Sequence, residues 1–123
     1  MRRKFFFLIA AILWTVLVIY LSLAIISVQE VSLQFFKNQD KIVHFTFYFV
    51  FTLLWFESAK RIENNKKRLL LVIGAAILLG IIMELCQGFF TNYRSPDIWD
   101  ICANSLGALL AGTLINRFRL KKT

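Results

Sequence analysis

The sequence contains few of the residues that form turns or disulfide bonds. Its 123 residues include one proline, five glycines and two cysteines. So few turn formers leave little room for loops, which predicts one small domain over 1–123 built mostly of helices. Cys86 and Cys102 both fall inside apolar segments at no metal-binding spacing. We therefore expect them to pack as small apolar side chains rather than to form a disulfide.

Acidic residues are also scarce, with seven against fifteen lysines and arginines, which gives a net charge of +8. A charge of this size would suit a nucleic-acid partner. The basic residues, however, cluster at the ends of apolar runs, where membrane topology places them. Apolar residues are abundant, at 59% against about 45–50% in soluble domains. The composition therefore predicts a membrane protein whose partners are lipids, with no nucleic acid.

Four apolar runs have about the length needed to cross a bilayer, for which roughly 20 residues are required. In chain order they cover residues 5–26, 42–59, 69–90 and 98–115. The fourth run is the least apolar, because Asp100 and Asn104 stand in its first two turns. The pattern predicts an all-α fold, an integral membrane four-helix bundle in the cell membrane.

The lysines and arginines orient these four predicted spans. Most of them precede the first run, separate the second from the third, or follow the fourth. The exceptions are Lys37, Lys41 and Arg94. Because positive loops stay on the cytoplasmic side, we expect a multi-pass protein with both termini in the cytoplasm.

With that orientation, polar residues from the second, third and fourth helices share the outer end of the bundle. They are Asp40, Lys41, His44, Glu84, Gln87, Arg94, Asp97, Asp100 and Asn104. Ionisable residues inside a membrane usually face the bundle interior and mark a functional site. Glu84 is the deepest carboxylate, and we expect His44, Arg94 or a bound cation as its partner. Other roles stay open for some members: Asp97 also fits a helix cap, and Asn104 an interhelical hydrogen bond.

Small residues indicate where the helices approach closely. Two adjoining strips of the fourth helix carry Ala103, Gly107 and Ala111, and Asn104, Ala108 and Gly112. On the third helix, Gly80 lies one turn below Glu84. Faces of this kind allow close backbone contact in lipid. We therefore expect the third and fourth helices to pack tightly, with the second beside them.

Three stretches together resemble the VanZ-like family of small bacterial membrane proteins. They are "DKIVHF" at the start of the second span, "MELCQGFF" at the end of the third, and "RSPDIWDICANSLGALLAG" opening the fourth. The resemblance covers about residues 40–112. It implies a cell-envelope membrane protein of the kind named after a teicoplanin-resistance accessory protein. We expect no cofactor.

Two functions follow from the predicted site, and the sequence leaves the choice between them open. The first is a binding protein whose outward polar pocket takes a lipid-linked or amphiphilic anionic ligand, such as an envelope precursor or a lipoglycopeptide. The alternative is a small membrane enzyme that acts on an envelope lipid or precursor. Its candidate catalytic residues are His44, Glu84 and Asp100, which suit acid–base or metal chemistry. Whether a metal takes part is not fixed by the residues.

Overall fold

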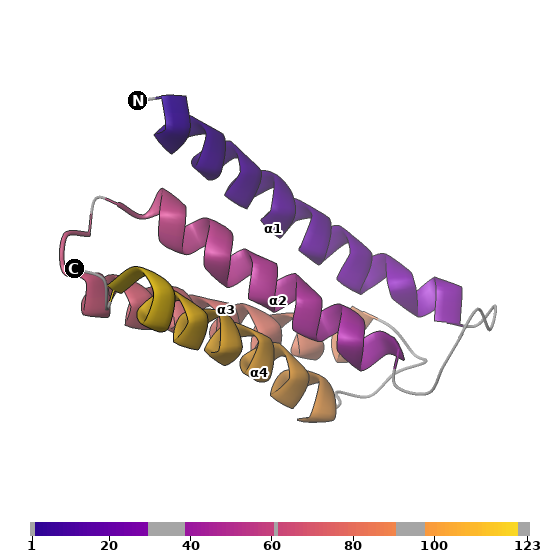
Figure 1. The fold of residues 1–123 in the computed structure, drawn as a ribbon. Coiled ribbons are helices and arrows are strands. Elements are labelled where there is room, and N and C mark those ends of the chain that lie inside the picture. The colour runs from indigo at the N-terminus through magenta and orange to yellow at the C-terminus, as the bar shows by residue number, and fades with distance from the viewer. Residues whose placement is uncertain (1, 30–38, 61, 91–97, 121–123) are drawn as a thin grey trace.

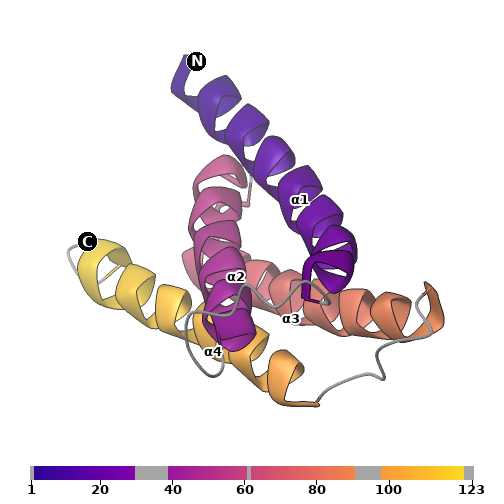
Figure 2. The same cartoon turned by 90° about the vertical axis from the view of Figure 1, so that its right-hand side faces the viewer.

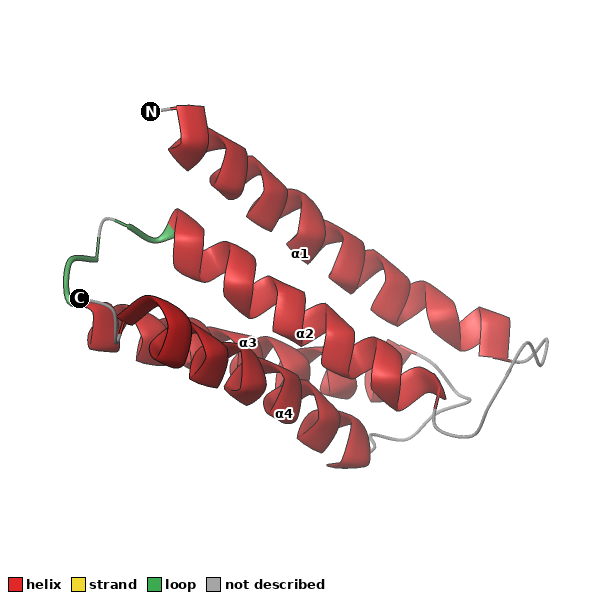
Figure 3. Cartoon of the chain, viewed as in Figure 1, coloured by secondary structure: helices red, strands yellow, loops and turns green. Residues whose placement is uncertain are grey.

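The computed structural model describes residues 2–29, 39–60, 62–90 and 98–120, and within these residues every secondary-structure element is a helix. The helices are α1 (Arg2–Gln29), α2 (Gln39–Ser58), α3 (Asn65–Phe90) and α4 (Ile98–Ile115). A π-helical turn, η1 (Asn116–Leu120), continues α4 (Figure 3). The predicted all-α architecture of four helices is confirmed for these residues.

Helix α4 has the predicted bounds, whereas the other three begin before the apolar runs that predicted them. The added residues are largely polar or charged. The helices extend over them because lysine, arginine and glutamine form helices well even though they are not apolar. The start of α3 is fixed by Asn64, whose Oδ1 accepts a hydrogen bond from the Lys67 N–H at 3.1 Å. This is the usual arrangement of an N-terminal cap.

The four helices run antiparallel in chain order. The start of α1, the end of α2, the start of α3 and the end of α4 lie together at one end of the bundle (Figure 1). We call this the termini end, and the opposite end, where α2 and α4 begin, the site end. Helix α2 lies between α1 and α4 in both views (Figures 1 and 2).

The most extensive helix contact is between α2 and α4, rather than between α3 and α4 as the small residues led us to expect. The reason is Gly107, at which an added Cβ would collide with the backbone carbonyl oxygen of Phe45. That Cβ would also lie 3.2 Å from the Phe49 nitrogen. The strip of Ala103, Gly107 and Ala111 is buried, and Gly107 lies directly against the backbone of α2.

The adjoining strip of α4 lies against α3. A Cβ added at Gly112 would lie 2.5 Å from Ile73 Cδ1, and one added at Gly80 of α3 would lie 2.9 Å from Asn104 Nδ2. Between these two contacts, Ala108 joins a buried apolar cluster with Tyr48 of α2 and Ala76 of α3. Helix α4 is thus close to both neighbours, each through its own strip of small residues.

Helix α1 is held mainly against α2, by two indole N–H groups. Trp14 Nε1 donates to the Phe47 carbonyl oxygen at 2.8 Å, and Trp55 Nε1 donates to Thr15 Oγ1 at 2.8 Å. Val18 contributes a fully buried side chain to the central apolar cluster. The contact of α1 with α3 is much smaller.

Large apolar side chains are exposed on all four helices, for example Leu13 at 64%, Phe89 at 84% and Trp99 at 67%. Two helices are long and apolar enough to span a membrane, over Asn65–Cys86 and Ile98–Phe118. Only 28% and 39% of their apolar windows are buried inside the protein. Central helices of a soluble domain would be mostly buried, so these two are compatible with a membrane protein.

Candidate functional site

The candidate site lies at the site end of the bundle, where α2 begins, α3 ends and α4 begins (Figure 1). Five of the predicted site residues have described side chains: Lys41, His44, Glu84, Asp100 and Asn104. Arg94 and Asp97 lie outside the described residues, and so do the side chains of Asp40 and Gln87.

Asp100 is the centre of the outer layer of this site. Its side chain is fully buried, and Lys41 Nζ lies 3.4 Å from Oδ1. His44 Nε2 lies 3.9 Å from Oδ2, near enough for an ion pair when the imidazole is protonated but too long for a hydrogen bond. Lys41 and His44 are three residues apart, so one face of α2 carries both. Asp100 stands in the first turn of α4, where the helix dipole favours a negative charge.

Exposure differs among these three residues. The Lys41 side chain is 29% exposed, that of His44 9% and that of Asp100 0%. The ammonium group is therefore the outermost part of the cluster, with the imidazole and the carboxylate behind it. A buried carboxylate needs a partner of opposite charge or several hydrogen bonds, and Lys41 supplies the charge.

An inner layer of polar groups lies about one helical turn deeper. Asn104 follows Asp100 by one turn and is 1% exposed. Its amide group lies against Gly80, which has no side chain to keep α3 away. Asn104 Oδ1 has no hydrogen-bond partner among the described residues, so it offers an acceptor to a further group.

Glu84 and Tyr48 complete this inner layer. Glu84 is 1% exposed, one turn from Gly80 on α3, and Tyr48 is fully buried, one turn from His44 on α2. The two side chains are close enough for the carboxylate to act electrostatically on the phenol. The Tyr48 hydroxyl has no hydrogen-bond partner among the described residues. The layer thus combines a carboxylate, an amide and a phenol from three helices.

The geometry places both Lys41 and His44 beside Asp100 and keeps Glu84 and His44 away from the exposed surface of the bundle. Tyr48 was absent from the predicted site. Its signal was its position, since it follows His44 by four residues on the same face of α2. In the part of the chain that the structure describes, no three His, Cys, Asp or Glu side chains are placed to hold a metal ion.

Comparison with known proteins identifies the family. The sequence profile of VanZ/LLP1 matches residues 6–119, nearly the whole chain. The chain belongs to the VanZ/LLP1 family. The resemblance of the three stretches that open or close the predicted spans is thereby confirmed, and the match includes the first helix as well.

One curated relative of this VanZ/LLP1 chain is an uncharacterized protein of the fission yeast Schizosaccharomyces pombe. The two are 34% identical over 86 residues, which cover 68% of this chain and 52% of the relative. The chain thus spans about half the length of the curated relative that it matches. No solved structure matches this chain.

The site of this VanZ/LLP1 chain can perform two kinds of chemistry. Lys41 presents a cation at the outer boundary, which suits an anionic group. His44 beside the buried Asp100 carboxylate has the composition of a base held in place by an acid. Behind them, Glu84, Asn104 and Tyr48 provide one carboxylate, one amide and one hydroxyl in a setting with almost no solvent contact.

Proposed function

We propose that this protein spans a membrane four times, with both termini cytoplasmic and the candidate site on the outer side. The two apolar helices and the exposed apolar side chains of all four helices support insertion. Both chain termini and the α2–α3 connection lie at one end of the bundle (Figure 1). Because most basic residues belong to that end, the positive-inside rule assigns it to the cytoplasm.

The function that the site supports best is binding of the anionic head group of an amphiphile. The observation that carries the proposal is the outer cluster, in which a fully buried Asp100 carboxylate holds a partly exposed Lys41 ammonium group. Asp100 positions the lysine and His44 lies behind it. An incoming phosphate or carboxylate meets a cation whose orientation is already fixed, so little side-chain entropy is lost on binding.

The apolar part of such a ligand stays in the surrounding lipid. The relative in a yeast favours a ligand class shared by different membranes, with an anionic lipid as its simplest member. A lipid-linked envelope precursor and teicoplanin, the lipoglycopeptide suggested by the family name, are larger members of the same chemical class. A role in antibiotic resistance would depend on binding of the last of these.

The test is direct binding to the purified protein in phosphatidylcholine nanodiscs. Phosphatidylglycerol and teicoplanin serve as anionic probes, and the measured quantity is the dissociation constant of the wild type against Lys41→Gln. Lys66→Gln is the matched control, because it removes the same charge from the exposed start of α3 at the termini end. We expect Lys41→Gln to weaken binding about fivefold or more, since one lysine contributes about 1 kcal/mol to an anionic contact. Equal losses in both variants would contradict the proposal.

Catalysis on an envelope lipid is the second candidate, and one observation favours it. His44 Nε2 faces a buried carboxylate at 3.9 Å, and a buried histidine and acid are the usual components of general base catalysis. The protein would then change the lipids around it. Lipid profiles of membranes that contain the wild type or His44→Gln separate the two functions, because a binding protein leaves both profiles the same.

A further inference from the structure

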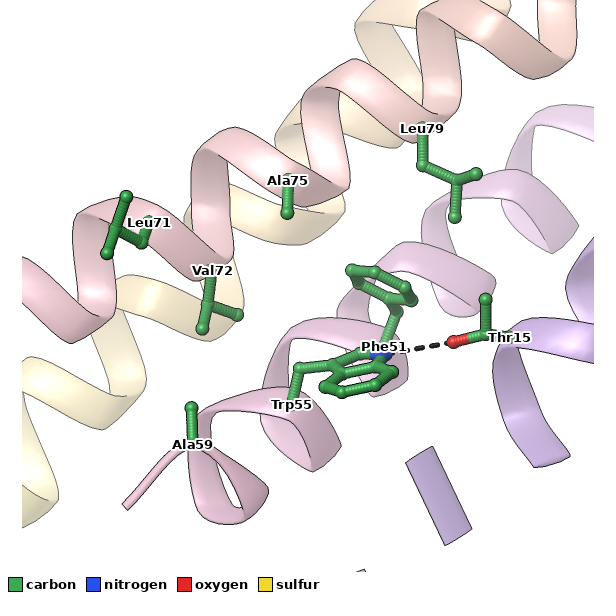
Figure 4. Close-up of a pocket in the computed structure, with 8 residues that line it drawn as sticks. All are labelled: Thr15, Phe51, Trp55, Ala59, Leu71, Val72, Ala75 and Leu79. Atoms are coloured by element: carbon green, nitrogen blue, oxygen red, sulfur yellow. Dashed lines mark hydrogen bonds between the residues drawn. The ribbon is translucent and has the colours of Figure 1, made fainter. Parts of the chain in front are cut away.

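A second binding feature begins near the termini end of the bundle and extends to the middle of α3, and it shares no residue with the candidate site. It is an open cavity of about 340 Å³ between α1, α2 and α3 (Figure 4), which we call the α1–α3 groove. Its floor is formed by Phe51 and Trp55 of α2. Leu71, Ala75 and Leu79 of α3 form one wall, and Thr15 of α1 lies opposite.

The walls of the groove are apolar even where a polar residue lines it. The Thr15 hydroxyl donates to the Ala11 carbonyl oxygen at 2.8 Å and accepts the indole N–H of Trp55 at 2.8 Å. Both polar groups are therefore already paired, as Figure 4 shows for the second bond. The groove presents methyl, methylene and aromatic surface, which suits a hydrocarbon chain and excludes a polar ligand.

The groove has the shape of an elongated slot along α3. The lining residues of α3 extend from Leu71 to Leu79, which is about 12 Å at 1.5 Å per residue. The groove is open toward the outside, where Leu71 is 51% exposed. It exists because α1 is held against α2 by its two indole hydrogen bonds and has little contact with α3.

Positive charge flanks one end of the groove. Lys60 directly follows Ala59, a lining residue at the end of α2. Lys67 precedes Leu71 by four residues on α3, so it continues the lining face of that helix toward the termini end. Lys60 also forms an ion pair with Glu57 at 3.8 Å. Basic residues still outnumber acidic ones in this part of the sequence, because Lys66 and Arg68 add two positive charges and Glu63 adds one negative charge.

An apolar slot with a cationic end matches one ligand class. We propose that the α1–α3 groove binds an anionic phospholipid, with one acyl chain in the groove and the phosphate at Lys60 and Lys67. This proposal rests on the membrane placement given under the proposed function but not on the candidate site, which lies at the other end. Lipids of the cytoplasmic leaflet carry the matching negative charge.

The experiment uses the full chain in phosphatidylcholine nanodiscs that contain a small fraction of phosphatidylglycerol with a photoreactive acyl chain. Labelled residues are located by mass spectrometry, and unlabelled phosphatidylglycerol or phosphatidylcholine is added as competitor. We expect labelling to concentrate on Trp55 and Leu71, and phosphatidylglycerol to compete better than phosphatidylcholine. Equal competition by the two lipids would overturn the proposal.

Two pairs of variants separate the acyl chain from the head group. Ala75→Phe fills the groove and should reduce labelling of Trp55 severalfold. Its control is Gly74→Phe, because a Cβ added at Gly74 has no atom within 4 Å and Gly74 does not line the groove. Lys67→Gln should weaken competition by phosphatidylglycerol about fivefold, and Lys66→Gln, on the adjoining face, should weaken it less. Wild-type labelling in Ala75→Phe refutes the acyl site.

A failure of membrane insertion gives a different pattern. Leu78 is 58% exposed on α3 and lies outside the groove. Inserted protein must receive some label at Leu78 from the bulk lipid. If neither Leu78 nor Trp55 is labelled, the membrane placement itself is wrong, and the groove proposal falls with it. Label on Leu78 without enrichment at Trp55 refutes the groove alone.

Discussion

The contact between α2 and α4 gives the sharpest prediction, because a single methyl group at Gly107 tests it. In a Gly107→Ala variant the new Cβ would collide with the Phe45 carbonyl oxygen and lie 3.1 Å from the Phe45 carbonyl carbon. These are backbone atoms within α2, so no side-chain rotation relieves the overlap. The two helices must move apart.

The magnitude follows from two opposing effects. Overpacking of a tight contact costs about 1–3 kcal/mol, and rigid backbone atoms favour the upper part of that range. Replacement of a helical glycine by alanine stabilises the helix by up to about 1 kcal/mol, because alanine has the higher helix propensity. We expect Gly107→Ala to lower the free energy of unfolding by about 2 kcal/mol. The assay is unfolding of the purified protein in mixed micelles, followed by circular dichroism.

The other glycines supply controls within the same chain. Gly74→Ala meets no atom within 4 Å, so only the propensity gain of about 0.5–1 kcal/mol remains. Gly112→Ala meets the movable end of the Ile73 side chain, whereas Gly80→Ala meets both the amide of Asn104 and its Cβ, at 3.1 Å. Because these are side-chain rather than main-chain atoms, both losses should fall between the two extremes, with the larger one at Gly80. A Gly107→Ala protein as stable as Gly74→Ala would refute the α2–α4 contact described above.

Three further predictions concern the site, the attachment of α1 and the topology. A double-mutant cycle of Lys41→Gln and Asp100→Asn should give a coupling energy of about 1–3 kcal/mol in unfolding experiments, because the lysine contacts a buried carboxylate; additive losses would contradict their contact. Trp55→Phe should cost about 0.5–1.5 kcal/mol through the lost hydrogen bond to Thr15. Thr15→Val should cost a similar amount, and the double variant little more than either one, whereas a doubled loss would show that the two side chains act separately. In a chain without Cys86 and Cys102, single cysteines at Glu63 and Asn116 should react with a membrane-impermeant reagent only from the cytoplasmic side. A cysteine at Trp99 should react only from the outer side, and reaction of all three from one side would contradict the four-span topology.

The number and order of the helices were predictable because the length of each apolar run can be counted in the sequence. The ends of the helices were less predictable, because an apolar run ends at the first charged residue whereas the helix can continue. Lys66 and Lys67, for example, lie inside α3. Helix α4 was predicted with its final bounds, since Pro96 shortly precedes it and basic residues begin directly after Asn116.

The partner of each small-residue strip could not be read from the sequence. Gly107 and Gly112 look alike in a list of spacings, but the first contacts the backbone of α2 and the second a side chain of α3. The rotation of α4 about its axis decides between them, and that rotation depends on all helices at once. The same limit explains Tyr48, whose role as a neighbour of Glu84 requires the angle between α2 and α3.

The two small-residue strips of α4 also bear on how the protein is made. Helix α4 is the less apolar of the two helices that are long and apolar enough to span a membrane, and an aspartate raises the cost of entering a bilayer, by up to about 2.5–3.5 kcal/mol at a helix centre. The lysine that pairs with Asp100 belongs to α2, and Gly80 of α3 leaves the space that Asn104 occupies; both helices leave the ribosome before α4. In a bilayer, α4 therefore inserts last, against helices that are already in place. With the membrane placement proposed above, the order of synthesis is also the order in which the site is assembled, because Asp100 arrives after the helix that carries Lys41.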